Sequence, residues 1–340
     1  MRVTLEDVCE KGASNLKQSD VVSMTGEYPI YGAAGYLGNV DFYHQEKPYV
    51  AIVKDGAGIG RTTLHPAKSS VIGTMQYLLP KDNVLPEYLY YVVRHMHLEK
   101  YFTGATIPHI YFRDYKNEKF NLDSLDKQAE IVEILEKAEL VILKRRQQLA
   151  ELDNLIKARF VEMFGDYLKD DRRPLSEVAI ITGGLTKNSN RNTFETKMPY
   201  LRVANVFYNR LDLREILEIG VKEEEIEKTL LQAGDLLFVE GNGSIEQIGR
   251  VAIWDGSIDP ILHQNHLIKA RFNNEIIAPE YALFYFMLQD GRQQIISKSV
   301  STSGLNTLSV NKVSSLLLPI PPIALQKQFG EFVKQTDKSK

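Results

Sequence analysis

DKQAEIVEILEKAELVILKRRQQLAELDNLIKARFVEMF, residues 126–164, predicts one long helix in the middle of the chain. The stretch contains no proline and no glycine, and most of its residues are strong helix formers. Ser124 is suited to cap its start, and Gly165 is a typical stop. At a rise of ~1.5 Å per residue the helix would be roughly 58 Å long. A helix of this length cannot be buried inside one compact domain of ordinary size.

The apolar residues of this helix recur at steps of three and four, which is the seven-residue pattern of a coiled-coil seam. The predicted seam consists of Ile131, Leu135, Ala138, Ile142, Leu149, Leu152, Ile156 and Met163. Arg145 and Arg159 fall on the same line and weaken it. The stripe needs an apolar partner, although a plain spacer between two domains would also explain a long helix.

The composition is that of an ordinary globular protein large enough for two or three domains. The chain has 340 residues, 44% hydrophobic and 25% charged, with a formal net charge of −3. Basic residues that bind nucleic acid would therefore have to gather on one surface. The single cysteine, Cys9, excludes an internal disulfide. No signal-peptide core and no apolar run of ~20 residues is present, so we expect a cytoplasmic protein without a membrane span.

The segments on either side of the long helix repeat the same order of elements. Each half begins with short strands, continues through a Gly-rich loop and a helix, and ends in a strand that leads to another helix. Four pairs of short motifs occur in the same order, 190–200 residues apart. They are Ile59-Gly60-Arg61 with Ile248-Gly249-Arg250, Pro86-Glu87-Tyr88 with Pro279-Glu280-Tyr281, Gly104 with Gly304, and Leu125-x-x-Gln128 with Ile323-x-x-Gln326. The repeat indicates an internal duplication.

An autonomous active site is not indicated by any motif. GAGIG at residues 56–60 lacks the third glycine of a dinucleotide fingerprint, and no phosphate-binding Gly-Lys-Ser/Thr is present. His95 and His97, expected on a helix, would point to different faces. His263 and His266 are expected on one strand, again on opposite faces. We therefore predict no catalytic, cofactor or metal site in this chain.

The loops of both halves carry side chains suited to DNA. Arginine reads guanine and Asn or Gln reads adenine in the major groove, while Ser, Thr and Lys serve bases and phosphates. Each such residue taken singly is usually just solvated, but their clustering at equivalent places favours a binding role. The candidates are Lys54, Arg61, Thr62, Thr63, Gln76, Thr106, His109, Tyr111, Arg113, Arg202, Asn205, Asn242, Ser244, Gln247, Arg250, Ser301, Thr302, Ser303, Asn306 and Thr307.

The sequence resembles the specificity subunits of type I restriction–modification enzymes over nearly its whole length. The resemblance rests on EYPIYGAAGYLGN and VAIVKDGAGIGRTTL in the first half. In the second half it rests on PYLRVANV, AGDLLFVEGNGSIEQIGRVAIW and LLLPIPPIALQKQFGEF. It implies an α+β protein with two β-rich target recognition domains and long spacer helices that form a coiled coil, related by a pseudo-two-fold internal repeat. We expect these parts at residues 1–122 and 166–320, with spacer helices at 123–165 and 321–340.

The resemblance also implies a function and a set of partners. Each domain would read one half of a split site on double-stranded DNA, and the helices would set the gap and dock methyltransferase subunits. S-adenosylmethionine, ATP and Mg would bind those subunits and the motor–nuclease subunits, so this chain would be a non-catalytic part of an adenine-N6 methyltransferase and restriction complex. The alternative is a coiled-coil scaffold that binds protein rather than DNA, which salt dependence of binding would distinguish.

The second spacer helix departs from the family pattern because it is short. Gly330 should interrupt it, and its last residues are polar. Part of the seam on the first helix would then lack its partner. We expect the isolated chain to self-associate or to be poorly soluble, and a clean monomer in light scattering at tens of micromolar would contradict this.

Overall fold

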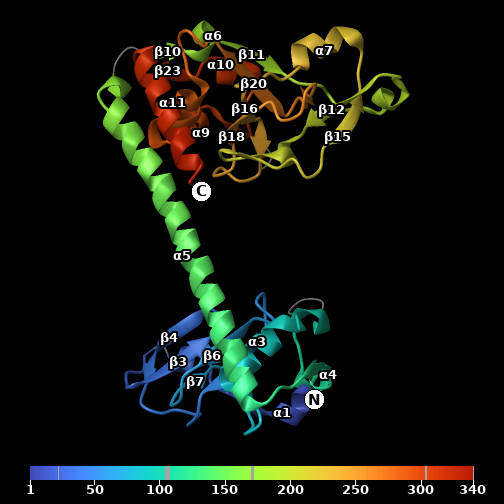
Figure 1. Ribbon diagram of the computed structural model, residues 1–340, viewed down its shortest axis with the longest axis vertical. Coiled ribbons are helices and arrows are strands. Elements are labelled where there is room, and N and C mark those ends of the chain that lie inside the picture. Colours follow the sequence, from blue (N-terminus) through green and yellow to red (C-terminus); the bar gives the residue numbers. More distant parts are fainter. Residues whose placement is uncertain (22, 104–107, 170–171, 303–304, 340) are drawn as a thin grey trace. The chain divides into compact units, whose positions relative to one another are not determined.

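The computed structural model describes residues 1–21, 23–103, 108–169, 172–302 and 305–339. The chain divides into two compact units, Met1–Arg145 and Arg146–Lys340. Helix α5, Leu125–Phe164, is continuous, and the division between the units falls within it (Figure 1). The long helix predicted from residue 126 to residue 164 is therefore confirmed.

The first unit contains two main sheets and a short ribbon. Their strands run in the orders β2-β8-β5-β6, β4-β3-β7 and β1-β9. The strands are β1 (Arg2–Thr4), β2 (Cys9–Ala13), β3 (Tyr28–Gly32), β4 (Gly35–Val40), β5 (Tyr49–Val53), β6 (Thr62–His65), β7 (Ser70–Val71), β8 (Met75–Pro80) and β9 (Lys119–Asn121). The helices before α5 are α1 (Leu5–Val8), α2 (Gln18–Val21), α3 (Pro86–His95), η1 (Leu98–Tyr101) and α4 (Phe112–Tyr115).

The second unit repeats this plan and adds to it. The corresponding orders are β11-β20-β16-β18, β15-β12-β19 and β10-β23. The strands in these sheets are β10 (Arg172–Pro174), β11 (Ala179–Gly183), β12 (Lys197–Leu201), β15 (Leu217–Gly220), β16 (Leu236–Val239), β18 (Val251–Ile253), β19 (Leu262–His263), β20 (Leu267–Phe272) and β23 (Leu317–Pro319). Two further small sheets contain β13 (Val206–Phe207), β14 (Arg210–Leu211), β17 (Gly241–Asn242), β21 (Val300–Thr302) and β22 (Leu305–Thr307).

In the view of Figure 1 the helices of the second unit lie to the left of these sheets and above them. They are η2 (Tyr167–Lys169), α6 (Leu175–Val178), η3 (Ser189–Thr193), η4 (Val203–Asn205), α7 (Glu223–Thr229), α8 (Pro279–Met287), α9 (Gln289–Lys298), α10 (Val310–Ser314) and α11 (Ile323–Asp337). In both units the four-stranded sheet is antiparallel throughout, and the three-stranded sheet contains one parallel pair, β3 with β7 or β12 with β19. The predicted duplication and α+β class are confirmed.

The duplication extends to individual hydrogen bonds. Gln128 on α5 is fully buried, and its Oε1 accepts a bond from Leu85 N just before α3 at 2.9 Å. Gln326 on α11 is equally buried, and its Oε1 accepts a bond from Ala278 N just before α8, also at 2.9 Å. Each glutamine thus accepts a hydrogen bond from the backbone N–H of the residue at the start of a helix, where the N-cap residue forms no side-chain bond of its own. Gly104 and Gly304, the fourth predicted pair, lie outside the described residues.

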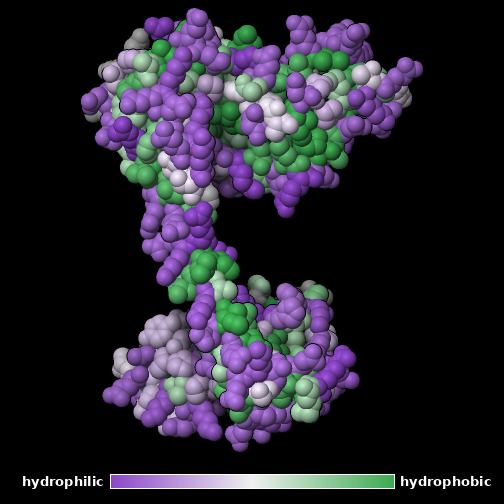
Figure 2. All heavy atoms as spheres, viewed as in Figure 1, coloured by the Kyte–Doolittle hydropathy of each residue, from purple (hydrophilic) through white to green (hydrophobic). Residues whose placement is uncertain are grey.

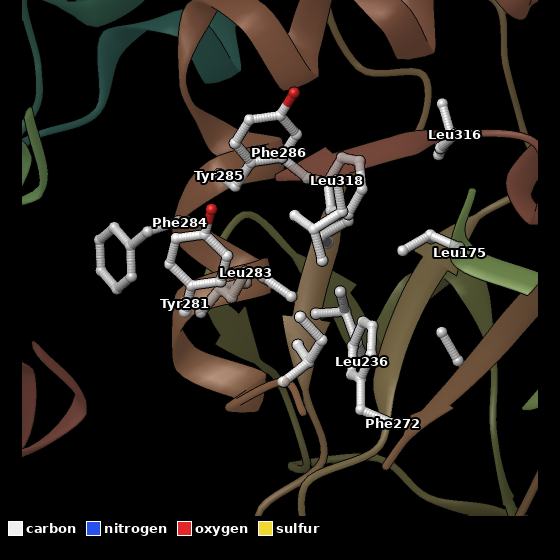
Figure 3. Close-up of a cluster of buried hydrophobic side chains, with 14 of the residues drawn as sticks. Leu175, Leu236, Phe272, Tyr281, Leu283, Phe284, Tyr285, Phe286, Leu316 and Leu318 are labelled. Carbon is white, nitrogen blue, oxygen red and sulfur yellow. The ribbon is translucent and has the colours of Figure 1, made fainter. Parts of the chain in front are cut away.

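The main core of the second unit lies between the four-stranded sheet and helix α8. Figure 3 shows Leu236 and Phe272 from the sheet on the side of Leu283 of α8, with Leu318 beside Phe286 and with the ring of Phe284 directed away from the sheet. Helix α8 is buried on nearly all sides, because α11 and the end of α5 cover its outer face. In the first unit, β5 is buried along its whole length, which agrees with its apolar sequence YVAIV.

The predicted seam is not buried as one stripe. Ile156 is buried, whereas Ile131, Leu135, Leu149, Leu152 and Met163 are partly buried and Ala138 and Ile142 are exposed. The ends of α5 pack instead through Val132 in the first unit and through Phe160 and Phe164 in the second. These three positions were missed because they lie off the seven-residue register.

Three local predictions were wrong. Gly330 does not interrupt α11, because it is buried beside Glu280 of α8 and packing outweighs its cost of about 1 kcal/mol in a helix. The single helix expected after the Gly-rich loop of the second half is two helices, which separate at Leu288, where the backbone is extended. The strand expected to hold His263 and His266 is also two strands, with a turn between β19 and β20.

Candidate nucleic-acid interface

The Gly-rich loop of the first unit joins β5 to β6 and is closed by two backbone bonds. Gly60 N donates to Val53 O at 2.9 Å, and Val53 N donates to Arg61 O at the same distance. Gly60 has a φ of +81°, and a Cβ at this position would lie 2.6 Å from Glu99 N. Because both the conformation and the space require glycine, this residue determines the shape of the loop.

The Gly-rich loop of the second unit joins β16 to β18 and has the same closure. Gly249 N donates to Val239 O at 3.1 Å, and Val239 N donates to Arg250 O at 2.9 Å. Gly249 has a φ of +60°, and its Cβ would lie 2.4 Å from Ile295 Cγ2. The predicted equivalence of Ile59-Gly60-Arg61 and Ile248-Gly249-Arg250 is therefore confirmed in three dimensions.

Each Gly-rich loop is joined to the late loop of its own unit. In the first unit Ile110 N donates to Lys54 O at 3.0 Å, and Gly56 N donates to Pro108 O at 3.0 Å. In the second unit Leu308 N donates to Glu240 O at 2.7 Å, and β17 pairs with β22. Residues about 50 to 70 positions apart in sequence are thus joined in each unit. We call the Gly-rich loop and the late loop of one unit, taken together, the joined loops of that unit.

The joined loops of the first unit expose several of the predicted residues. Arg61, Tyr111 and Arg113 are exposed, while Lys54 and His109 are partly exposed. The Arg113 guanidinium lies 4.7 Å from the centroid of the Tyr111 ring. The His109 ring is nearly parallel to the Tyr111 ring, and its Nδ1 lies 2.6 Å from Asp55 Oδ1. This row of planar groups offers faces on which a nucleotide can stack, and Arg113 at its end also pairs with Asp114 at 3.5 Å.

The joined loops of the second unit carry a different set of groups. Asn242 Oδ1 accepts a bond from Ser244 N at 2.9 Å, which shapes the turn. Arg250 is half-buried, 5.3 Å from the Phe207 ring centroid, and its Nη2 donates weakly to Val203 O at 3.4 Å. Burial lowers the pKa of this guanidinium, yet an arginine stays charged at neutral pH. Arg250 Nε has no partner among the described residues.

The remaining second-unit candidates vary in accessibility. Gln247, Asn306 and Thr307 are half-buried, and the latter two lie on β22 opposite β17. Arg202 pairs with Glu215 at 2.9 Å, so its charge is already balanced. Ser301 and Thr302 lie on β21, next to β22. Thr106 and Ser303 lie outside the described residues.

Three of the candidates are buried and form hydrogen bonds within the fold. Gln76 lies on β8, where its Nε2 donates to Gly12 O on the neighbouring strand. Asn205 Nδ2 donates to two backbone carbonyls, Asp212 O at 2.8 Å and Glu215 O at 3.0 Å. Thr62 Oγ1 donates to Gly60 O. Thr63 is partly exposed, and its Oγ1 lies 2.7 Å from His65 Nε2.

Two residues that contact the second Gly-rich loop were missed. Tyr208 lies in the turn between β13 and β14, and Arg292 lies on α9. Both donate to backbone carbonyls of this loop, about 40 residues away in sequence. Neither residue could have been predicted from the spacing of motifs, because the sequence does not show which side chains of α9 and of the β13–β14 turn contact the loop.

His263 is a buried structural group rather than a ligand. Its Nδ1 lies 2.8 Å from Thr229 O, and burial lowers its pKa to about 4. The unfolded chain, with a histidine pKa of about 6.5, therefore binds the proton more readily than the folded one. His263 stabilises the fold fully above pH ~6.5, and this contribution is lost as the pH falls toward 4.

We expect wild type to lose up to about 3 kcal/mol more stability than the His263→Asn variant between pH 7 and pH 4. Asparagine can still donate to Thr229 O but does not titrate. Denaturant unfolding at a series of pH values, followed by the fluorescence of the single tryptophan, Trp254, measures the difference. Two parallel stability curves would contradict the assignment.

The comparisons with known proteins agree with the duplicated fold. The sequence profile of the type I restriction modification DNA specificity domain matches residues 1–154 and 171–340. The type I restriction enzyme MjaX specificity subunit of Methanocaldococcus jannaschii is 30% identical over 193 residues, which are 56% of this chain and 44% of that protein. The EcoKI specificity subunit of Escherichia coli is 28% identical over 204 residues, 57% of this chain and 42% of that protein. The matches therefore span less than half of these relatives.

Two solved structures share the fold along the whole chain. The S subunit of a type I restriction–modification system from M. genitalium has a TM-score of 0.58 at 16% identity and is covered over 89% of its length. A chain from a structure of complex assembly in a type I system has a TM-score of 0.51 at 13% identity and is covered over 90%. No helix in the described residues is long and apolar enough to cross a membrane. With both of its units matched by the family profile, the chain belongs to the family of type I restriction–modification DNA specificity domains and carries two copies of that domain.

Proposed function

We propose that this chain is a sequence-specific DNA-binding specificity subunit of a type I restriction–modification complex. The observation that carries the proposal is the presence of joined loops in both units, each closed by the same backbone bonds around a positive-φ glycine. Two similar scaffolds with different polar side chains are what a reader of a bipartite site requires. Each unit would bind one half-site. The family match favours this function over the protein-binding scaffold.

Helix α5 would act as the spacer and as a docking surface for methyltransferase subunits. Its middle section exposes Ile134, Val141, Ile142 and Leu143, each by more than half of its surface. Figure 2 shows this hydrophobic surface on the helix. Covering it gains ~25 cal/mol per Å² of apolar surface, so a partner protein is favoured there. Motor–nuclease subunits would join the same complex.

The chemistry would be carried out by the partners. S-adenosylmethionine, ATP and Mg would bind the methyltransferase and motor–nuclease subunits, and this chain would supply sequence recognition alone. A direct test is methylation sequencing of genomic DNA from cells that co-express the chain with its cognate methyltransferase subunit. We expect a bipartite motif with a fixed gap and N6-methyladenine in both halves. A soluble complex that methylates no defined motif would contradict the proposal.

Arg250→Ala should change recognition of one half-site only. Its half-buried guanidinium lies beside Gln247 in the second Gly-rich loop, where a base contact is worth ~1–3 kcal/mol of discrimination. We expect the motif to become degenerate at one or two positions of one half, while the other half keeps its sequence. Arg173→Ala, an exposed arginine on β10 outside the joined loops, is the matched control. An unchanged motif in Arg250→Ala would show that the loop is wrongly assigned.

A further inference from the structure

The turn of residues 244–249 in the second Gly-rich loop is held from inside by two side chains that the sequence places far away. We propose that Arg292 and Tyr208 are positioning residues, which set the shape of this turn and thereby the specificity for one half-site. This inference rests on the proposed function, since it assigns a role to the same loop.

The guanidinium of Arg292 binds three successive parts of the turn. Its Nη2 donates to Ile245 O at 2.8 Å and to Glu246 O at 3.0 Å, and its Nη1 donates to Ile248 O. The hydroxyl of Tyr208 donates to Glu246 O at 2.7 Å. The guanidinium also lies 5.6 Å from the centroid of the Tyr208 ring. Two side chains thus hold three of the four carbonyls between residues 245 and 248.

Arg292 is committed to this turn rather than to an ion pair. Within the described residues its guanidinium bonds backbone carbonyls and forms no ion pair with a carboxylate, and burial lowers its pKa. A half-buried positive charge without a carboxylate needs several good acceptors, and the three carbonyls supply them. The planar fork of arginine can reach all three at once, which the single ammonium group of a lysine cannot.

With three of its carbonyls bound from inside, the turn exposes the side chains of residues 244–246, whereas Ile248 is buried in the core. Ser244 and Ile245 are exposed, Ile245 by 42%, and Gln247 is half-buried beside Arg250. Ser and Gln can bond base edges, and an apolar side chain can contact the methyl group of thymine. Their positions relative to a base depend on the turn, so that a shift of about 1 Å would weaken several contacts together.

The first unit has no such arrangement in its described residues. Strand β3 is followed directly by β4, whereas the β13–β14 hairpin that carries Tyr208 lies between β12 and β15. The helix that follows α8 in the second unit, α9, has ten residues, whereas the helix that follows α3 in the first unit, η1, has four. The first Gly-rich loop is closed by its own chain instead, as Ile59 N donates to Gly56 O and Arg61 N donates to Gly58 O. The second unit therefore sets its turn with elements that the first unit lacks.

The test uses Arg292→Ala, Arg292→Lys and Tyr208→Phe in the chain complexed with its methyltransferase subunit. Binding is measured to duplexes that carry single-base changes in one half-site at a time. For Arg292→Ala we expect discrimination against changes in one half-site to fall about tenfold, and discrimination in the other half to stay at the wild-type value. Arg292→Lys should recover part of the loss. Gln293→Ala, an exposed neighbour on α9, is the control.

A merely structural role would give a different result. Methylation and binding would weaken equally for all duplexes, with discrimination unchanged in both halves, and that outcome would overturn the inference. If Arg292→Ala does not fold, Tyr208→Phe decides, because it removes one hydroxyl. A fall of about threefold in the same half-site supports the inference, and wild-type discrimination overturns it. If the wild-type complex itself shows no bipartite preference, the proposed function fails before any variant is compared.

Discussion

Phe329→Ala is expected to destabilise the second unit by about 3–5 kcal/mol. Phe329 of α11 is fully buried, and its ring centroid lies 5.3 Å from that of Phe160 and 5.6 Å from that of Phe164, both on α5. It also contacts Phe284 of α8 at 5.4 Å. Truncation would leave a cavity among three rings that cannot collapse easily, because the rings are held on two different helices, α5 and α8.

Urea unfolding followed by Trp254 fluorescence measures this effect, since this buried residue is the only tryptophan of the chain and lies in the second unit. Leu155→Ala is the matched control. Leu155 lies on α5 in the same unit but is 50% exposed, and we expect a change within about 0.5 kcal/mol. Equal effects of the two substitutions would mean that the aromatic cluster stabilises the second unit no more than an exposed side chain of α5 does.

Gln326→Ala should destabilise the second unit by about 3 kcal/mol through unsatisfied backbone groups rather than through lost packing. The side chain accepts a bond from Ala278 N and donates to Ile276 O at 3.0 Å and to Pro321 O at 2.8 Å. All three groups belong to loops that meet at the start of α8 and α11. Alanine cannot replace any of these bonds, and the buried site admits water poorly.

The duplication provides a test of this explanation. Gln128→Ala should destabilise the first unit to a similar extent, because Gln128 binds Leu85 N, Asn83 O and Asp123 O in the same way. Gln128→Ala should leave unchanged the urea unfolding transition that Trp254 fluorescence reports for the second unit, whereas Gln326→Ala should shift that transition to lower urea. Gln335→Ala, an exposed glutamine on α11, should change neither. If Gln326→Ala unfolds at the wild-type urea concentration, the buried amide is not a stabilising group.

Much of the fold could be predicted because its signals are local. Helix α5 forms where forty residues contain no helix breaker, and α3 and α8 each begin at a proline that suits a first turn. The break at His97, which has a φ of +52°, and the break at Leu288 carry no such signal. At both breaks the helix that follows, η1 or α9, changes direction and packs against the Gly-rich loop of its own unit, η1 beside Gly60 and α9 beside Gly249.

The candidate interface was predicted in outline and not in detail. The Gly-rich loops were found because glycine at a strand end is a strong turn signal. Gln76 and Asn205 were chosen because Asn and Gln suit adenine edges, but here their amide groups bond backbone carbonyls within the fold. Arg292 and Tyr208 were overlooked because their partners are backbone carbonyls, which any sequence would offer.

The sequence by itself determined the order of elements, the duplication and the glycines of both loops, since each depends on the conformational preferences of neighbouring residues. Only the tertiary structure decided which residues of α5 are buried, which polar side chains face solvent, and that Arg292 and Tyr208 meet the 244–249 turn. Most of these outcomes depend on contacts between segments far apart in the sequence, whose free energy is set by packing and by buried hydrogen bonds. Such contacts leave no periodic trace in a single sequence.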